Sequence, residues 1–106
     1  MADEQGPEPG AGMPTEEQIR DALDRVGVSD VLLNAASAAA SLGFRRVSPE
    51  ARDLPQARLA IEALRALEPV LLEGGVDEAV VRDLEQARLN LQLAYAKAIE
   101  EDSAGS

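Results

Sequence analysis

The stretch Ser29–Phe44 reads SDVLLNAASAAASLGF, and from Val31 to Phe44 it contains no charged residue. The chain as a whole is strongly charged, with 10 basic and 20 acidic residues among 106. Alanine and leucine, which dominate the stretch, are among the strongest helix formers. A helix that is apolar on most sides has to bury its surface against other elements. The stretch therefore predicts an all-α fold that is built by packing around this helix.

Both ends of this helix carry boundary signals. Ser29 is the predicted N-cap, and Asp30 follows it in the first turn, where a negative charge suits the helix dipole. Gly43 is the predicted C′ residue, and we expect residues 45–53 to form a loop. The polar side chains are three and four residues apart, which places them along one face: Asn34, Ser37 and Ser41. We expect a helix that is buried on three sides and weakly polar on the fourth.

Three further helices are predicted. Thr15 and Gln18 form a capping box that opens a short N-terminal helix, which Gly27 ends. A second helix begins after Asp53, and Pro69 either stops it or bends it; the apolar residues 70–72 favour a bend. The last helix begins after Asp77 and runs to about residue 101. It has an unbroken heptad-type seam and a second apolar line beside it: Leu89, Leu93 and Ala96.

These elements predict a small three-helix bundle in which the Ala-rich helix packs on an antiparallel helical hairpin, with a short extra N-terminal helix. Residues 1–14 are rich in Gly, Pro and acidic residues, so we expect a disordered acidic tail there. Residues 15–101 are expected to form the helical domain. Residues 102–106 are expected to form a disordered C-terminal tail.

The composition removes most catalytic and metal-binding chemistry. The chain has no Cys and no His, and so lacks thiol chemistry, the commonest general base and the commonest metal ligand. The carboxylates of Glu100, Glu101 and Asp102 occupy consecutive helical positions, which do not converge on one metal ion. The serines have no His to activate them. We expect a non-enzymatic protein with no catalytic residue, no metal and no cofactor.

Charge and hydropathy also narrow the partners. A net charge of −10 disfavours nucleic acids and anionic lipids, since a protein this acidic repels their phosphates. No segment approaches the roughly 20 apolar residues that cross a bilayer, and the acidic N-terminus lacks the pattern of a signal peptide. We expect a cytoplasmic protein that binds neither nucleic acid nor membrane.

Three stretches follow one another in a defined order: DVLLNAASAAASLG at 30–43, LPQARLAIEALRAL at 54–67 and LEQARLNLQLAYAK at 84–97. They form a short Ala/Ser-rich helix that ends in Gly, a Leu-x-x-Ala-Arg helix, and a Leu-rich helix with an aromatic residue near its end. This order resembles the bacterial domain-of-unknown-function family 1844. The resemblance implies a small helical cytoplasmic protein of unassigned function, associated with genes of the translation machinery, and it supplies no catalytic residues.

The candidate site is the line of Asn34, Ser37 and Ser41, together with Ala38 between them. This line is either the exposed side of a packed helix or an interface with a second copy or a partner protein. Small uncharged residues allow close helix approach, whereas exposed helix faces usually carry Glu, Lys or Arg. A chain this small with almost no aromatic residues gains stability by dimerising. We expect an interaction or adaptor module that forms a homodimer; the alternative is a small acidic regulatory factor that binds a basic or ribosome-associated protein.

Overall fold

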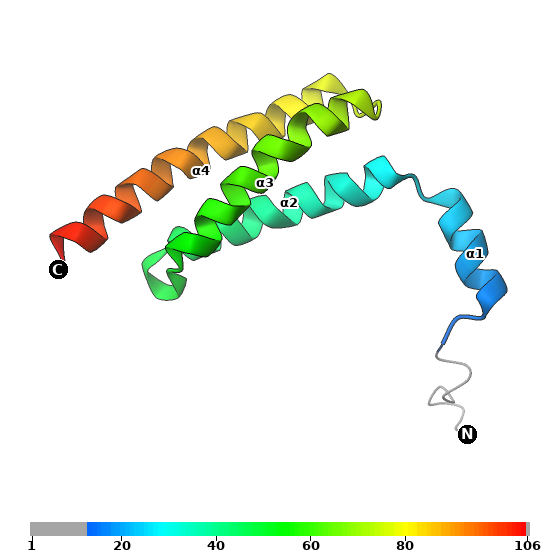
Figure 1. The fold of residues 1–106 in the computed structure, drawn as a ribbon, viewed down its shortest axis with the longest axis horizontal. Helices are drawn as coiled ribbons and strands as arrows, with labels where there is room; N and C mark the ends of the chain where they lie inside the picture. The colour runs from blue at the N-terminus through cyan, green and yellow to red at the C-terminus, as the bar shows by residue number, and fades with distance from the viewer. Residues whose placement is uncertain (1–12, 106) are drawn as a thin grey trace.

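The computed structural model describes residues 13–105, and every regular element in this range is a helix (Figure 1). The elements are α1 (Glu16–Arg25), α2 (Val28–Val47), the short 3₁₀ helix η1 (Pro49–Ala51), α3 (Leu54–Glu73) and α4 (Glu78–Ala104). The prediction of an all-α fold is confirmed. Most of the predicted tail at residues 1–14 lies outside the described residues; Met13 and Pro14 are exposed and precede α1.

Three of the helices pack together and one does not. Figure 1 shows α3 running back along α2 and α4 running back along α3. Each of these three helices contacts the other two, whereas α1 contacts no other helix among the described residues. α1 turns away from the start of α2, with a bend of 83° between the two helices. The packed part of the molecule therefore consists of α2, α3 and α4.

The core lies where these three helices meet. Its largest fully buried side chains are Leu64 and Leu71 of α3 and Leu91 of α4. α2 contributes mostly small residues to this core, since its buried positions are Ala36, Gly43 and Val47. Small side chains let helix axes approach closely, which compensates for the near absence of aromatic residues.

Gly43 does not end the Ala-rich helix, so this prediction is wrong. α2 continues to Val47, and Arg45 and Arg46 lie in its last turn instead of a loop. Gly43 is buried, and a Cβ atom there would lie 2.5 Å from Leu91 Cδ2 and 3.0 Å from the Cβ of Ala60. The glycine is therefore required by the close approach of three helices.

The predicted caps of the other helices are confirmed. Thr15 Oγ1 accepts a hydrogen bond from the Gln18 N–H at 3.1 Å, and Gln18 Oε1 accepts one from the Thr15 N–H at 2.9 Å. Asp53 and Asp77 cap α3 and α4. α3 is one continuous helix across Pro69, as its apolar face indicated. Gly75, with a φ of +89°, makes the turn between α3 and α4, because this left-handed backbone favours glycine.

The C-terminal end of α4 departs from the prediction. α4 extends to Ala104, so residues 102–104 belong to the helix and not to a disordered tail. Arg52 holds this end, because its guanidinium donates to Asp102 Oδ1 at 2.9 Å, to Glu101 Oε1 at 3.0 Å and to a backbone carbonyl at the end of α2. The two carboxylates raise the pKa of Arg52 above its ordinary value, so its charge is retained. This cation offsets the unfavourable position of acidic residues at a helix C-terminus.

Candidate functional site

The start of α2 differs by a few residues from the predicted one. Gly27 is the N-cap, and Asp30 Oδ2 accepts a hydrogen bond from the Gly27 N–H at 3.3 Å. Ser29, the predicted N-cap, lies in the first turn and is half-buried. Asp30 therefore caps the helix from inside it, and the uncharged residues that follow occupy its middle turns.

The four predicted interface residues are all exposed. Asn34, Ser37, Ala38 and Ser41 lie on the side of α2 away from its buried positions. The fold thus brings them together on one accessible helix face, as their spacing indicated.

α2 is not buried on three sides, so this part of the prediction is wrong. Only one side of the helix packs against α3 and α4, and an apolar line next to the small polar residues is exposed. Val31 is 54% exposed and Leu42 is 56% exposed, with exposed Ala35 between them. Among the described residues, α3, α4 and the short η1 contact α2, and α1 does not cover it. We name this surface the outer face of α2: Val31, Asn34, Ala35, Ser37, Ala38, Ser41 and Leu42.

A groove between α2 and α3 borders the outer face. It has a volume of about 240 Å³ and is lined by Ala39, Leu42, Gln56, Leu59, Ala60 and Ala63. Leu59 is 60% exposed, so the wall formed by α3 is apolar as well as accessible. Leu42 belongs to both the groove and the outer face, and the two therefore form one continuous uncharged surface.

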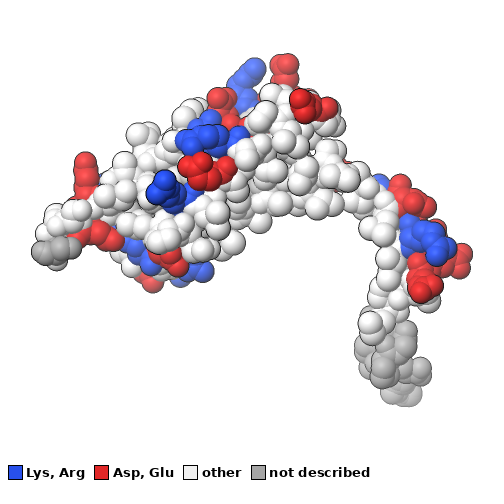
Figure 2. All heavy atoms as spheres, viewed as in Figure 1, with Lys and Arg blue, Asp and Glu red and all other residues white. Residues whose placement is uncertain are grey.

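This surface lies between charged regions. Figure 2 shows the middle of α2 without charged side chains, between the charged surface of α1 and that of α3 and α4. The only charged residues of α2 are Asp30 near its start and Arg45 and Arg46 in its last turn. A second molecule can pack on the outer face without desolvating an ionised group, which would cost several kcal/mol.

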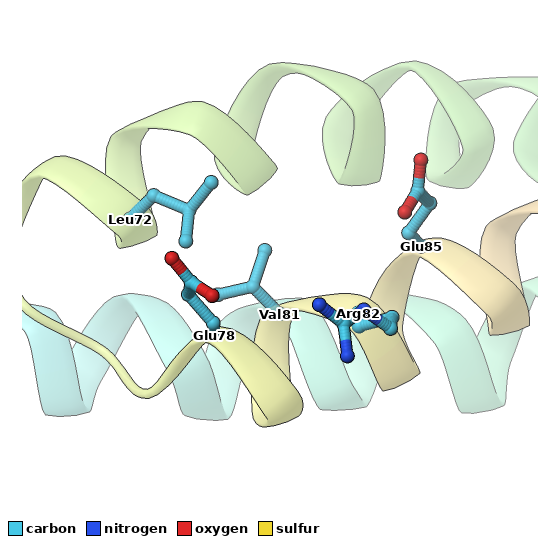
Figure 3. Close-up of a pocket in the computed structure, with 5 residues that line it drawn as sticks. All are labelled: Leu72, Glu78, Val81, Arg82 and Glu85. Carbon is cyan, nitrogen blue, oxygen red and sulfur yellow. The ribbon is translucent and has the colours of Figure 1, made fainter.

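A second depression lies near the turn between α3 and α4. Leu72 of α3 and Glu78, Val81, Arg82 and Glu85 of α4 line it (Figure 3). Leu72 and Val81 extend toward each other from the two helices, and the charged side chains lie around them. The three charged residues follow one another at the spacing of surface ion pairs on a helix. Within residues 13–105, no group of three or more Asp or Glu residues is placed to hold a metal ion.

A largely buried ion pair joins α3 to α4. Arg88 Nε donates to Glu68 Oε2 at 2.8 Å, and these two side chains are only 13% and 12% exposed. The hydrogen bond to Glu68 raises the pKa of Arg88, and the charge of Glu85 adds to this effect. The pair links α3 to α4 and includes no residue of the outer face of α2.

Sequence reasoning missed the α3 side of the groove. Leu59 lies outside the apolar stripe of α3, whose buried positions are Ala57, Ala60, Ile61, Leu64 and Leu71. A leucine off the stripe, where an exposed helix usually carries a polar residue, was the available signal. The second apolar line of α4 also proved exposed: Leu89 is 43% and Leu93 is 72% exposed.

Comparison with known proteins gives no relative: no family model, curated protein or solved structure matches the chain. The resemblance to domain-of-unknown-function family 1844 therefore stays a prediction. Within residues 13–105, no single helix is both long and apolar enough to cross a membrane; α1 and α2 reach this length and apolarity only as a bent pair.

Proposed function

We propose that this chain is a non-enzymatic protein–protein interaction module that self-associates as a homodimer through the outer face of α2. The observation that supports this function is an exposed helix face with no charged residue between Asp30 and Arg45, on which Val31 and Leu42 are more than half exposed. Exposed helix faces normally carry charged side chains, and contiguous apolar surface marks interaction sites. The proposal takes α2, α3 and α4 as a three-helix bundle that presents this face.

The small core adds a reason for association. Within residues 13–105, the largest fully buried side chains are three leucines, namely Leu64, Leu71 and Leu91. Burying apolar surface contributes about 25 cal/mol per Å², so a second copy seated on α2 stabilises both chains. The small residues on the outer face permit the close backbone approach that a helix–helix interface requires.

The test is the mass of the protein in solution. Wild type should elute as a dimer, measured by light scattering after gel filtration. Ala38→Glu and Ser37→Glu should shift the mass to that of a monomer, because each places a charge in the interface. Ala96→Glu adds the same charge at an exposed alanine of α4 and should leave a dimer. Wild type that is a monomer at every concentration, or dimeric Ala38→Glu, would contradict the proposal.

The second candidate is an acidic regulatory factor that binds a basic or ribosome-associated protein. Its support is the net charge of −10 and the run of Glu73, Asp77 and Glu78 at the turn between α3 and α4. Against it, Figure 2 shows acidic and basic side chains interspersed over α3 and α4. Salt separates the two candidates, since capture of a basic protein through charge weakens steeply between low and high salt, whereas apolar packing does not.

A further inference from the structure

α1 is an amphipathic helix without a packing partner. Its apolar side chains Ile19 and Leu23 are 45% and 68% exposed, the C-cap residue Val26 is 48% exposed, and no residue of α1 is buried. A helix of 10 residues is marginal on its own in water, since packing of its apolar face supplies most of its stability. The apolar stripe of α1 therefore fits a helix that docks on another surface.

The groove between α2 and α3 has the chemistry to receive this stripe. Its walls present Leu42 and Leu59, and its floor is formed by small residues such as Ala39 and Ala60. Arg45 and Arg46, the two basic residues in the last turn of α2, come three and four residues after Leu42, which lines the groove. α1 carries Glu16 and Glu17 in its first turn, so the charges of the two helices are complementary.

We propose that α1 of each copy lies in the groove between α2 and α3 of the other copy, antiparallel to α2. This arrangement rests on the self-association proposed above and identifies the segment that is exchanged. In the antiparallel orientation, Glu16 and Glu17 meet Arg45 and Arg46, and Ile19 then lies against Leu42.

The occupant is the second copy because the chain's own α1 does not reach this register. Only Val26 and Gly27 connect α1 to α2. Leu42 lies about 21 Å along the axis from Val28, at 1.5 Å per residue, whereas Ile19 lies only about 10 Å from Val26. A hairpin of α1 on its own α2 leaves Ile19 roughly 10 Å short of Leu42. In a two-fold dimer, α1 of one copy packs on α2 of the other copy, so the short connection between α1 and α2 no longer keeps Ile19 from reaching Leu42. Both copies then make identical contacts.

Cysteine cross-linking tests the exchange on a clean background, since the chain contains no Cys. The double variant Ile19→Cys/Leu42→Cys changes two exposed side chains, so the core of α2, α3 and α4 is preserved. A disulfide forms only when the two Cα atoms come within about 7 Å. Mild oxidation should give a covalent dimer on a non-reducing gel, several-fold faster than the control Asp24→Cys/Leu42→Cys. Asp24 lies on the side of α1 away from Ile19.

Every other outcome of the cross-linking contradicts the exchange of α1. The mass of wild type, measured by light scattering, then shows whether the protein self-associates without this exchange. An oxidised monomer with a disulfide within one chain means that α1 docks on its own α2. A double variant that links no faster than the control means that α1 does not enter the groove. If wild type is a dimer in either case, self-association stands and only the exchange is wrong. If wild type is a monomer, both proposals fail.

Discussion

Replacing Gly43 with alanine tests whether close packing is the reason for this glycine. In most helix interiors, Gly→Ala stabilises a protein by about 1 kcal/mol, because alanine has the higher helix propensity. At position 43 the new methyl group would lie 2.5 Å from Leu91 Cδ2 and 3.0 Å from the Cβ of Ala60, both well inside ordinary contact distance. The two effects have opposite signs, so the measured sign identifies the dominant one.

The expected net effect is destabilising. Leu91 is fully buried, and the Cβ of Ala60 is fixed to the backbone, so neither atom can move aside freely. Overpacking of this kind costs about 1–3 kcal/mol. After the gain in helix propensity is subtracted, Gly43→Ala should lower the free energy of unfolding by about 1 kcal/mol. Removing Leu91 Cδ2 should reverse the sign, so Gly43→Ala in a Leu91→Ala background should stabilise by up to about 1 kcal/mol.

The assay is urea unfolding followed by circular dichroism at one protein concentration, because the proposed dimer would make the measured stability depend on protein concentration. Ala96→Gly, at an exposed helical position of α4 outside the outer face of α2, calibrates helix propensity and should destabilise by about 1 kcal/mol. If Gly43→Ala stabilises wild type as much as Ala96→Gly destabilises it, the close approach of Leu91 does not limit position 43 and the reasoning is refuted.

Two further substitutions separate buried from exposed interactions, both measured by urea unfolding. Glu68→Gln should destabilise the protein by about 1–2 kcal/mol, because Arg88 keeps its charge in a largely buried site. Glu62→Gln breaks an ion pair that is half exposed and should cost less than about 0.5 kcal/mol. Equal losses of stability for the two variants would contradict this difference. Pro69→Ala should stabilise the protein by about 1–3 kcal/mol, because Pro69 is exposed inside α3 and lacks the backbone N–H that donates a hydrogen bond within the helix. An unchanged or lowered free energy of unfolding would show that proline is favourable at this position.

Capping residues in the sequence correctly predicted where three helices begin. Thr15, Asp53 and Asp77 cap their helices through hydrogen bonds to backbone N–H groups two or three residues ahead. Such bonds depend only on neighbours in the chain, so the residue types indicate them reliably. The C-terminal turn of α4 was different, because Arg52 holds it from about 50 positions earlier in the chain. No local pattern reports a contact over that separation.

Gly43 shows a second limit of sequence reasoning. A glycine at the end of an apolar stretch is the usual sign of a helix C-terminus, and Arg45 and Arg46 after it suit a loop. The same glycine is also what a helix needs where two others cross it closely. Ala60 and Leu91, which decide between these interpretations, come from two other helices. Only the packing of all three helices distinguishes a terminating glycine from a packing glycine.

The outer face of α2 follows from the same ambiguity. Ala36 is fully buried and Ala35 is exposed, although they are identical neighbours in the sequence. From the sequence alone, a helix without charged residues is therefore predicted to be buried on most sides. In the fold, α3 and α4 pack on α2 and bury only one of its sides. The surface left over keeps the composition of a core, and Val31 and Leu42 remain exposed on it. A helix that builds the core of its own chain with one side therefore presents, on the other, a surface suited to a second copy.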